Sequence, residues 1–183
     1  MLNTDFLKTL VVVFSITIIY TQCASFQSNP STSDTILSSS SNRTTNEQRL
    51  RREVVQYAKK HIGIGYQPAG RSSRGFDCSG FTHYVLRKFD IHLPTISAAQ
   101  EQKGAAVEVT QVEPGDLVFF RRQQKGRVFH VGLVVENTPS GIEVIHSTSS
   151  RGIVVDNISD SRFWSTKVLT ARNVLAPICC PAR

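Results

Sequence analysis

The sequence lacks the features by which nucleic-acid-binding proteins and repeat proteins are usually recognised. It has no internal repeat, no zinc-finger spacing of cysteine and histidine, and no aromatic-studded RNA-binding motif. Lysine and arginine outnumber aspartate and glutamate by 21 to 14, which gives a formal net charge of +7, but the basic residues are scattered. This excess favours an anionic partner, such as a phospholipid surface or an anionic polymer, and we expect no nucleic-acid partner.

Cysteine is also scarce. The four cysteines, Cys23, Cys78, Cys179 and Cys180, give no convincing disulfide framework. Cys179 and Cys180 adjoin each other near the C-terminus and are interpreted as part of an unimportant tail. Cys78 is left alone, and a lone cysteine can be a buried filler, a metal ligand, half of a disulfide or a nucleophile.

No apolar run is long enough to span a bilayer comfortably. The longest, residues 10–20, follows Lys8 and has the length of a signal-peptide core. Cys23 comes shortly after it, in an arrangement that resembles bacterial lipoproteins, whose cysteine becomes the lipidated first residue. We therefore expect residues 1–23 to be an export signal with Cys23 as the candidate lipidation site. Simple secretion and an uncleaved anchor remain the alternatives.

Residues 24–45 are dense in serine, threonine and asparagine and contain almost nothing large and apolar. Such a composition cannot offset the entropy lost on ordering, so we expect a flexible tether. The folded domain is then residues 46–178, which are enough for one domain with a sizeable core. This order of parts is what an exported protein held at a membrane surface and facing the periplasm or cell wall would need. We also expect a monomer.

The spacing of apolar residues predicts helices first and strands afterwards. Helices are expected over residues 46–62, 78–89 and 97–103, and strands over residues 107–109, 117–122, 128–136, 141–146, 152–156 and 167–174. The glycine-rich residues 63–76 are expected to form a loop without regular structure. The order predicts an α+β fold, with N-terminal helices packed on a mostly antiparallel sheet of about five to six strands.

Cys78 lies at the expected start of the second helix, beside the small residues Ser79 and Gly80. Unpaired amide groups and the helix dipole at such a position lower the pKa of a thiol. The same amides can donate to an oxyanion that forms on a substrate carbonyl. We therefore expect a thiolate with room beside it for a substrate, provided that a base lies nearby.

Two of the five histidines fall in consecutive expected strands, His130 in the strand over residues 128–136 and His146 at the end of the next. If these strands are neighbours, Cys78, His130 and His146 can form a linear relay. His130 then accepts the thiol proton and returns it to the leaving amine, while His146 holds the His130 ring in the productive tautomer. The same three side chains are also good zinc ligands, but no fourth ligand or short-spaced pair supports a metal site, so no metal or other cofactor is expected.

Five motifs occur in an order that resembles the NlpC-type cysteine peptidases of bacterial cell walls: GFDCSGF, LPTISAAQ, PGDLVFF, FHVGLVVE and VIHSTSS. The resemblance covers about residues 50–175. It implies a papain-like α+β fold and a cysteine endopeptidase that cleaves the peptide stems of peptidoglycan through a thioester, at D-glutamyl–diaminopimelate or diaminopimelate–D-alanine bonds. It also implies that Cys78 is the nucleophile, His130 the base and His146 the third polar residue.

Three further residues match binding positions of that family. The resemblance implies that the Tyr66 hydroxyl helps to bind the oxyanion, and that Asp77 and Ser79 contact the free amino end of the stem peptide. No cell-wall-binding repeat is present, so a lipid anchor at Cys23 is the expected means of attachment. The alternatives are a related amidase or acyltransferase acting on another amide or acyl substrate, and a wall-binding module that has lost its chemistry.

Overall fold

The computed structural model describes residues 32–123 and 125–175. The predicted export signal with Cys23, and the C-terminal pair of cysteines, lie outside the described residues. The contacts divide the chain into two units, residues 1–38 and 39–183, and every element that forms the site belongs to the second. In the described part of the chain, no helix combines the length and the hydropathy that crossing a bilayer requires.

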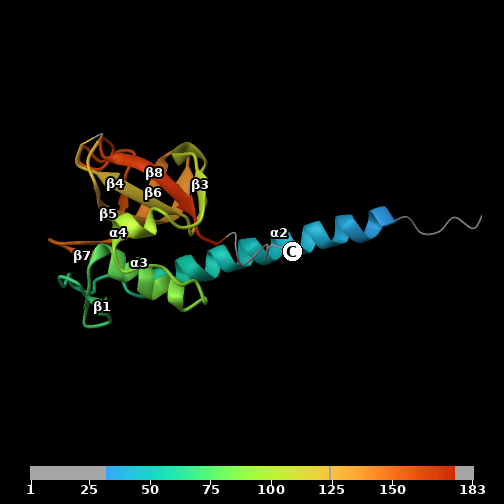
Figure 1. Ribbon diagram of the computed structural model, residues 1–183, viewed down its shortest axis with the longest axis horizontal. Helices are drawn as coiled ribbons and strands as arrows, with labels where there is room; N and C mark the ends of the chain where they lie inside the picture. The colour runs from blue at the N-terminus through green and yellow to red at the C-terminus, as the bar shows by residue number, and fades with distance from the viewer. Residues whose placement is uncertain (1–31, 124, 176–183) are drawn as a thin grey trace, which may run out of the picture. The chain divides into compact units, whose positions relative to one another are not determined.

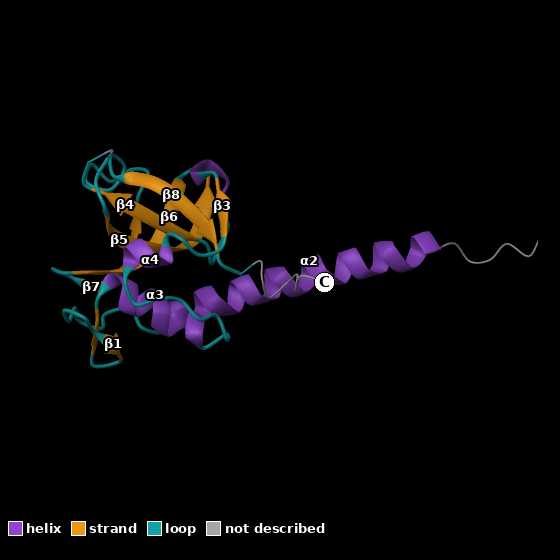
Figure 2. Cartoon of the chain, in the orientation of Figure 1, coloured by secondary structure: helices purple, strands orange, loops and turns teal. Residues whose placement is uncertain are grey.

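The described helices mostly precede the strands, as predicted (Figures 1 and 2). The helices are α2 (Thr32–Lys59), α3 (Cys78–Arg87), α4 (Ser97–Gln100) and the 3-10 helix η1 (Val109–Gln111). The strands are β1 (Arg71–Ser72), β2 (Gly75–Phe76), β3 (Ala105–Val107), β4 (Leu117–Arg121), β5 (Val128–Thr138), β6 (Gly141–Thr148), β7 (Gly152–Asn157) and β8 (Val168–Asn173).

Helix α2 begins at Thr32, whereas the sequence predicted a start at Asn46. Helix α2 therefore includes residues 32–45 of the segment predicted to be a tether, and residues 24–31 lie outside the described residues. The segment contains no glycine or proline that would stop a helix, and serine and threonine disfavour one by at most about 0.7 kcal/mol per residue relative to alanine. A helix held by its apolar face further along can extend back through such residues.

The glycine-rich segment also differs from the prediction, because residues 71–76 are not wholly irregular. Strands β1 and β2 form a short antiparallel pair in which Arg71 lies opposite Phe76. Tyr66 forms an isolated parallel bridge with the same Phe76, whose side chain is fully buried. This buried ring therefore anchors the segment that leads directly to Cys78.

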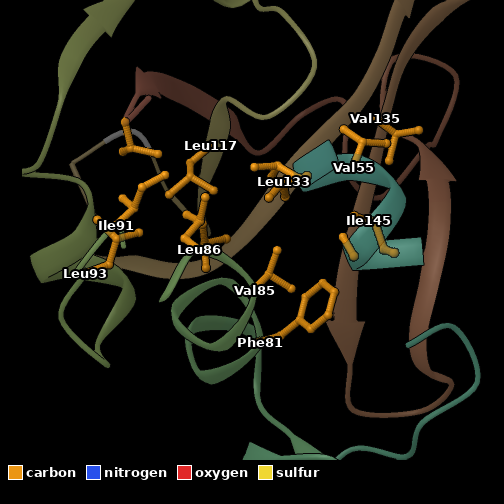
Figure 3. Close-up of a cluster of buried hydrophobic side chains, with 14 of the residues drawn as sticks. Val55, Phe81, Val85, Leu86, Ile91, Leu93, Leu117, Leu133, Val135 and Ile145 are labelled. Carbon is orange, nitrogen blue, oxygen red and sulfur yellow. The ribbon is translucent and has the colours of Figure 1, made fainter. Parts of the chain in front are cut away.

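Strands β3 to β8 form one antiparallel sheet in the order β3-β8-β4-β5-β6-β7. Alternate side chains face opposite sides. One side packs on the helices, and Figure 3 shows this cluster, in which α3 residues meet strand residues: Phe81, Val85, Leu86, Leu117, Leu133 and Ile145. The other side forms a second cluster around Val118, Phe120, Val134 and Trp164. Helices packed on an antiparallel sheet of six strands confirm the predicted α+β class.

A buried ion pair ties α2 to the loop before β4. The guanidinium of Arg51 lies 2.9 Å from a carboxylate oxygen of Asp116, and their side chains are only 6% and 2% exposed. Arg51 also pairs with Glu47 at 2.9 Å and Glu113 at 3.1 Å, and it donates to the Pro114 carbonyl. Two buried charges are tolerated here because each has several partners.

We predict that Arg51→Met destabilises the domain by about 3–5 kcal/mol, since it leaves the Asp116 carboxylate buried without a counter-charge. The control is Arg49→Met, which removes the exposed pair of Arg49 with Glu53 and changes the unfolding free energy by less than about 0.5 kcal/mol. Urea unfolding of both variants checks this. Equal, small losses in the two would contradict the assignment.

Candidate active site

Cys78 occupies the first turn of α3, as predicted. Asp77 caps the helix, and one of its carboxylate oxygens accepts from the Gly80 amide at 2.6 Å. Gly80 itself cannot carry a side chain, because a Cβ at this position would lie 2.0 Å from the carbonyl oxygen of Gly70. The Asp77 amide donates to that same carbonyl at 3.1 Å. The loop and the start of α3 are therefore packed backbone to backbone, and this contact fixes where the thiol points.

The pKa of the Cys78 thiol differs from the expected one, because it is raised and not lowered. Burial raises the pKa of Cys78 above its ordinary value, and the nearby Asp77 carboxylate raises it further. Backbone amides of Val131, Ser79 and Cys78 lower that pKa but do not outweigh the burial. The start of the helix was expected to lower the pKa of this thiol, but the desolvation of the sulfur is the larger effect and raises it.

His130 and His146 come together because β5 and β6 are neighbours, as the relay required. The Nε2 atom of His130 lies 2.9 Å from the Nδ1 atom of His146. Both rings are buried, at 7% and 0% exposure. Burial lowers the pKa of His130 to about 3, and the neighbouring His146 ring lowers it as well. His130 is therefore a neutral base with its Nδ1 atom left to meet a proton donor.

A carboxylate and a guanidinium extend this pair beyond the predicted residues. The Nε2 atom of His146 lies 3.0 Å from Oδ2 of Asp156. Arg151 holds both oxygens of that carboxylate, with distances of 3.0 Å to Oδ1 and 2.5 Å to Oδ2. The hydrogen bond from Arg151 lowers the pKa of Asp156 to about 2, against the opposing effect of its partial burial. Burial lowers the pKa of His146, although Asp156 opposes this.

An aromatic wall shields the histidine pair from water. The Trp164 ring stacks on His130 with 4.7 Å between centroids and 23° between planes, and it lies 5.0 Å from the His146 ring. The centroids of the Phe120 and His130 rings are 5.6 Å apart. Trp164 is itself only 9% exposed, so the wall contributes to the burial that lowers the pKa of His130.

A cavity of about 560 Å³ opens beside these groups. Cys78 and His130 both line it, which places the thiol and the base at one site. The other lining residues are hydroxyl, aromatic and charged: Tyr66, Arg122, Phe129, Ser147, Thr148, Ser149, Ser150, Arg151, Asp156, Asn157, Ser161, Phe163 and Trp164. A cavity of this composition suits a polar substrate with hydrogen-bonding groups.

The predicted binding residues separate into two kinds. Tyr66 is 40% exposed and lines the cavity, and its pKa is raised first by burial and then by the negative charges of Cys78 and Asp77. Ser79 is buried and donates to the Thr95 carbonyl at 2.9 Å and to Asp77 at 3.1 Å. Asp77 and Ser79 therefore have structural partners in the cap of α3, and their predicted contact with substrate remains a prediction.

The zinc-site alternative can be compared with the described part of the chain. Within residues 32–123 and 125–175, no group of three or more histidine, cysteine, aspartate or glutamate side chains is placed so as to hold a metal ion. The site as described has the parts of an acyl-transfer centre, namely a thiol, a neutral imidazole and a second imidazole bonded to it.

Comparison with known proteins places this α+β fold in one family. The model of the NlpC/P60 family matches residues 63–173, more than half of the chain, so the protein belongs to the NlpC/P60 family. A crystal structure of an NlpC/P60 family protein from Bacillus cereus is similar with a TM-score of 0.63 and 31% identity, over 68% of this chain and 40% of that one. The resemblance seen in the motifs, and the papain-like fold that it implied, are thereby confirmed.

Curated relatives carry peptidase and hydrolase names. The chain is 35% identical over 126 residues to the gamma-DL-glutamyl hydrolase of Bacillus subtilis, a match that covers 67% of this chain and 30% of the relative. It is 31% identical over 115 residues to the murein DD-endopeptidase/murein LD-carboxypeptidase of Escherichia coli, covering 62% of this chain and 57% of the relative. The chain thus spans less than two thirds of the length of either relative.

Sequence reasoning missed Asp156, Arg151 and Trp164. Asp156 was the last residue of an expected strand, and only the pairing register shows that it faces His146. Trp164 is the single tryptophan of the chain, and this rarity could have marked it as a candidate site residue. It lies after β7, however, in a segment whose apolar residues show no periodicity. Arg151 sits in the turn between β6 and β7, where a charged residue is ordinarily solvated.

The raised pKa of the thiol gives a testable reactivity profile. We predict that iodoacetamide alkylation of Cys78, followed by mass spectrometry of its peptide, keeps accelerating with pH beyond the ordinary thiol range, because only the thiolate reacts. Asp77→Asn keeps the helix cap but removes a negative charge, so alkylation at pH 7 becomes several-fold faster. Asp90→Asn, at the exposed far end of α3, leaves the rate unchanged. A plateau already below pH 7 in the parent protein would contradict the burial argument.

The aromatic wall gives a second prediction. Removing the Trp164 ring by Trp164→Ala admits water to His130, so the pKa of His130 rises from about 3 towards the ordinary value near 6.5. Trp164→Phe retains part of the wall and gives an intermediate value. NMR titration of the histidine ring protons measures this. A His130 pKa that stays near 3 in Trp164→Ala would show that the wall is not the cause.

Proposed function

We propose that the protein is a cell-wall hydrolase, a cysteine endopeptidase that cleaves the peptide stems of peptidoglycan. The observation that supports this most directly is that Cys78 and His130 line one cavity while His146 lies 2.9 Å behind His130. Membership of the NlpC/P60 family and the hydrolase and murein endopeptidase names of the relatives support the same reaction class. The bonds proposed are D-glutamyl–diaminopimelate or diaminopimelate–D-alanine.

In the proposed mechanism, Nδ1 of His130 takes the proton of Cys78 as the sulfur attacks the carbonyl carbon of the scissile bond. The amide at the start of α3 and the Tyr66 hydroxyl donate to the oxyanion. The imidazolium of His130 then protonates the leaving amine. Water, activated by the neutral His130, hydrolyses the thioester and frees Cys78.

The charge of the cavity rim suits such a substrate. Arg122 lines the cavity and stem peptides carry free carboxylates at neutral pH, whereas Arg151, which also lines it, is already paired with Asp156. The Arg122 guanidinium lies 4.9 Å from the centre of the Phe129 ring, which holds it at the rim by a cation–π contact. We propose that the enzyme acts as a monomer outside the cytoplasmic membrane, anchored through a lipid on Cys23.

Digestion of purified peptidoglycan with identification of the products by mass spectrometry tests the proposal and names the bond. We expect Cys78→Ala to reduce the release of cleaved stems by more than about 10³-fold. His130→Ala should reduce it by about 10²- to 10⁴-fold, and His146→Ala by about 10- to 100-fold.

His92→Ala, an exposed histidine outside the site, is the matched control and should retain full activity. Unchanged turnover in Cys78→Ala would refute the mechanism. Absence of any cleaved stem with the parent protein, together with turnover of a simple amide or ester, would favour the amidase or acyltransferase alternative.

A further inference from the structure

The register of three consecutive strands places Asp156 on the same face as both histidines. Strands β6 and β7 pair so that His146 lies opposite Val154. Asp156 is two residues further along β7, and its side chain therefore points to the same side of the sheet. A diagonal neighbour at this distance is within reach of a histidine ring, and the 3.0 Å contact between His146 Nε2 and Asp156 Oδ2 follows from it.

We propose that Asp156, held by Arg151, is a positioning residue that sets the tautomers of both histidines and so makes Nδ1 of His130 the proton acceptor for Cys78. The proposal rests on the function proposed above, because it assigns the proton path of that reaction. Neither Asp156 nor Arg151 was expected from the motifs, and neither side chain would touch the reacting atoms.

The tautomers follow from what each atom can donate. An ionised carboxylate only accepts hydrogen bonds, so Nε2 of His146 must carry a proton in order to bond with Asp156. In a neutral His146 the Nδ1 atom then carries a lone pair and no proton. This Nδ1 can therefore only accept a hydrogen bond from His130. Nε2 of His130 must therefore be the protonated nitrogen, and its Nδ1 is left with the lone pair that the thiol proton needs.

The carboxylate is prepared for this role by Arg151. The two hydrogen bonds from the guanidinium fix the plane of the Asp156 carboxylate and keep the group ionised. Hydrogen bonds within the turn fix the backbone of Arg151. Its amide donates to the Thr148 hydroxyl at 3.2 Å, and that hydroxyl donates to the Gly152 carbonyl at 3.2 Å. Gly152 has a φ of +68°, and a Cβ there would lie 2.2 Å from the Ile64 carbonyl oxygen, so the turn is seated tightly on the loop after α2.

Charge stabilisation during the reaction comes from the same contacts. When His130 takes the thiol proton on Nδ1, its Nε2–H remains donated to His146, and no proton moves on to Asp156. The imidazolium then lies two hydrogen bonds from a carboxylate in a buried setting, where electrostatic interactions are stronger than in water. The charged groups that act on His146 are Asp156 from β7 and Arg151 from the turn, and the titratable His130 ring from β5 is hydrogen-bonded to it.

The test is the full-length chain with Asp156→Asn. Asparagine has one acceptor oxygen where aspartate has two, so it cannot accept from both Arg151 nitrogens and from Nε2–H of His146 as the carboxylate does. The tautomers of the two histidines are then no longer fixed, and Nδ1 of His130 carries a proton in part of the molecules before the thiol can give up its own. We expect kcat on a stem peptide to fall by about tenfold or more, as for the carboxylate partners of metal-binding histidines, with KM little changed. Asp156→Glu should recover part of the loss, and Asp160→Asn, an exposed aspartate nearby on the chain, should lose nothing.

A substrate-free measurement keeps this test separate from the proposed function. In protein with ¹⁵N-labelled histidine, the ring nitrogen shifts report which nitrogen is protonated. We expect an unprotonated Nδ1 on His130 in the parent and a partly protonated one in Asp156→Asn. Circular dichroism confirms that the variant is folded. Identical ring shifts in parent and variant would overturn the proposal, whether or not the protein cleaves peptidoglycan. A parent that shows the expected shifts but no cleavage would refute the proposed function alone.

Discussion

The pairing register of β5, β6 and β7 is the constraint on which the site depends. Because side chains alternate along a strand, a slip of one residue in either pairing would send His130, His146 or Asp156 to the opposite face of the sheet. Burial on both faces prevents such a slip. Val144 belongs to one buried cluster and Ile145 to the other, so moving β6 by one residue would exchange their surroundings and turn the following residue, His146, towards the cluster under the helices. The packing of the apolar core thereby sets the relative positions of His130, His146 and Asp156, although the core side chains are not part of the relay.

The start of α3 shows two effects of one carboxylate that oppose each other. Asp77 stabilises the helix by accepting from Gly80 and Ser79, and a helix cap of this kind contributes about 1 kcal/mol. The same negative charge disfavours the thiolate next to it. Since burial also acts against the thiolate, the sulfur depends on the proton acceptor on β5 and not on the helix dipole.

Much of the fold could be predicted from the sequence, because its apolar spacing is regular. The strands that carry His130 and His146 were placed almost to the residue, and the neighbouring position of β5 and β6 was the simplest arrangement of consecutive strands. The beginning of α2 could not be predicted, since serine and threonine permit a helix that their composition does not favour. The short pair of strands before Cys78 depends on the buried ring of Phe76, a tertiary contact that no local pattern reveals.

The burial of Cys78 has a consequence for the chemical survival of the protein. Peroxides and disulfides react with thiolates and only slowly with protonated thiols. A sulfur that is protonated at rest, and that loses its proton only to a base fixed across the cavity, is therefore a poor target for diffusible oxidants. In an oxidising compartment such a thiol can stay reduced without a second cysteine beside it to restore it. Among the described residues Cys78 is indeed a free cysteine, and the desolvation that slows its reaction at rest also protects it.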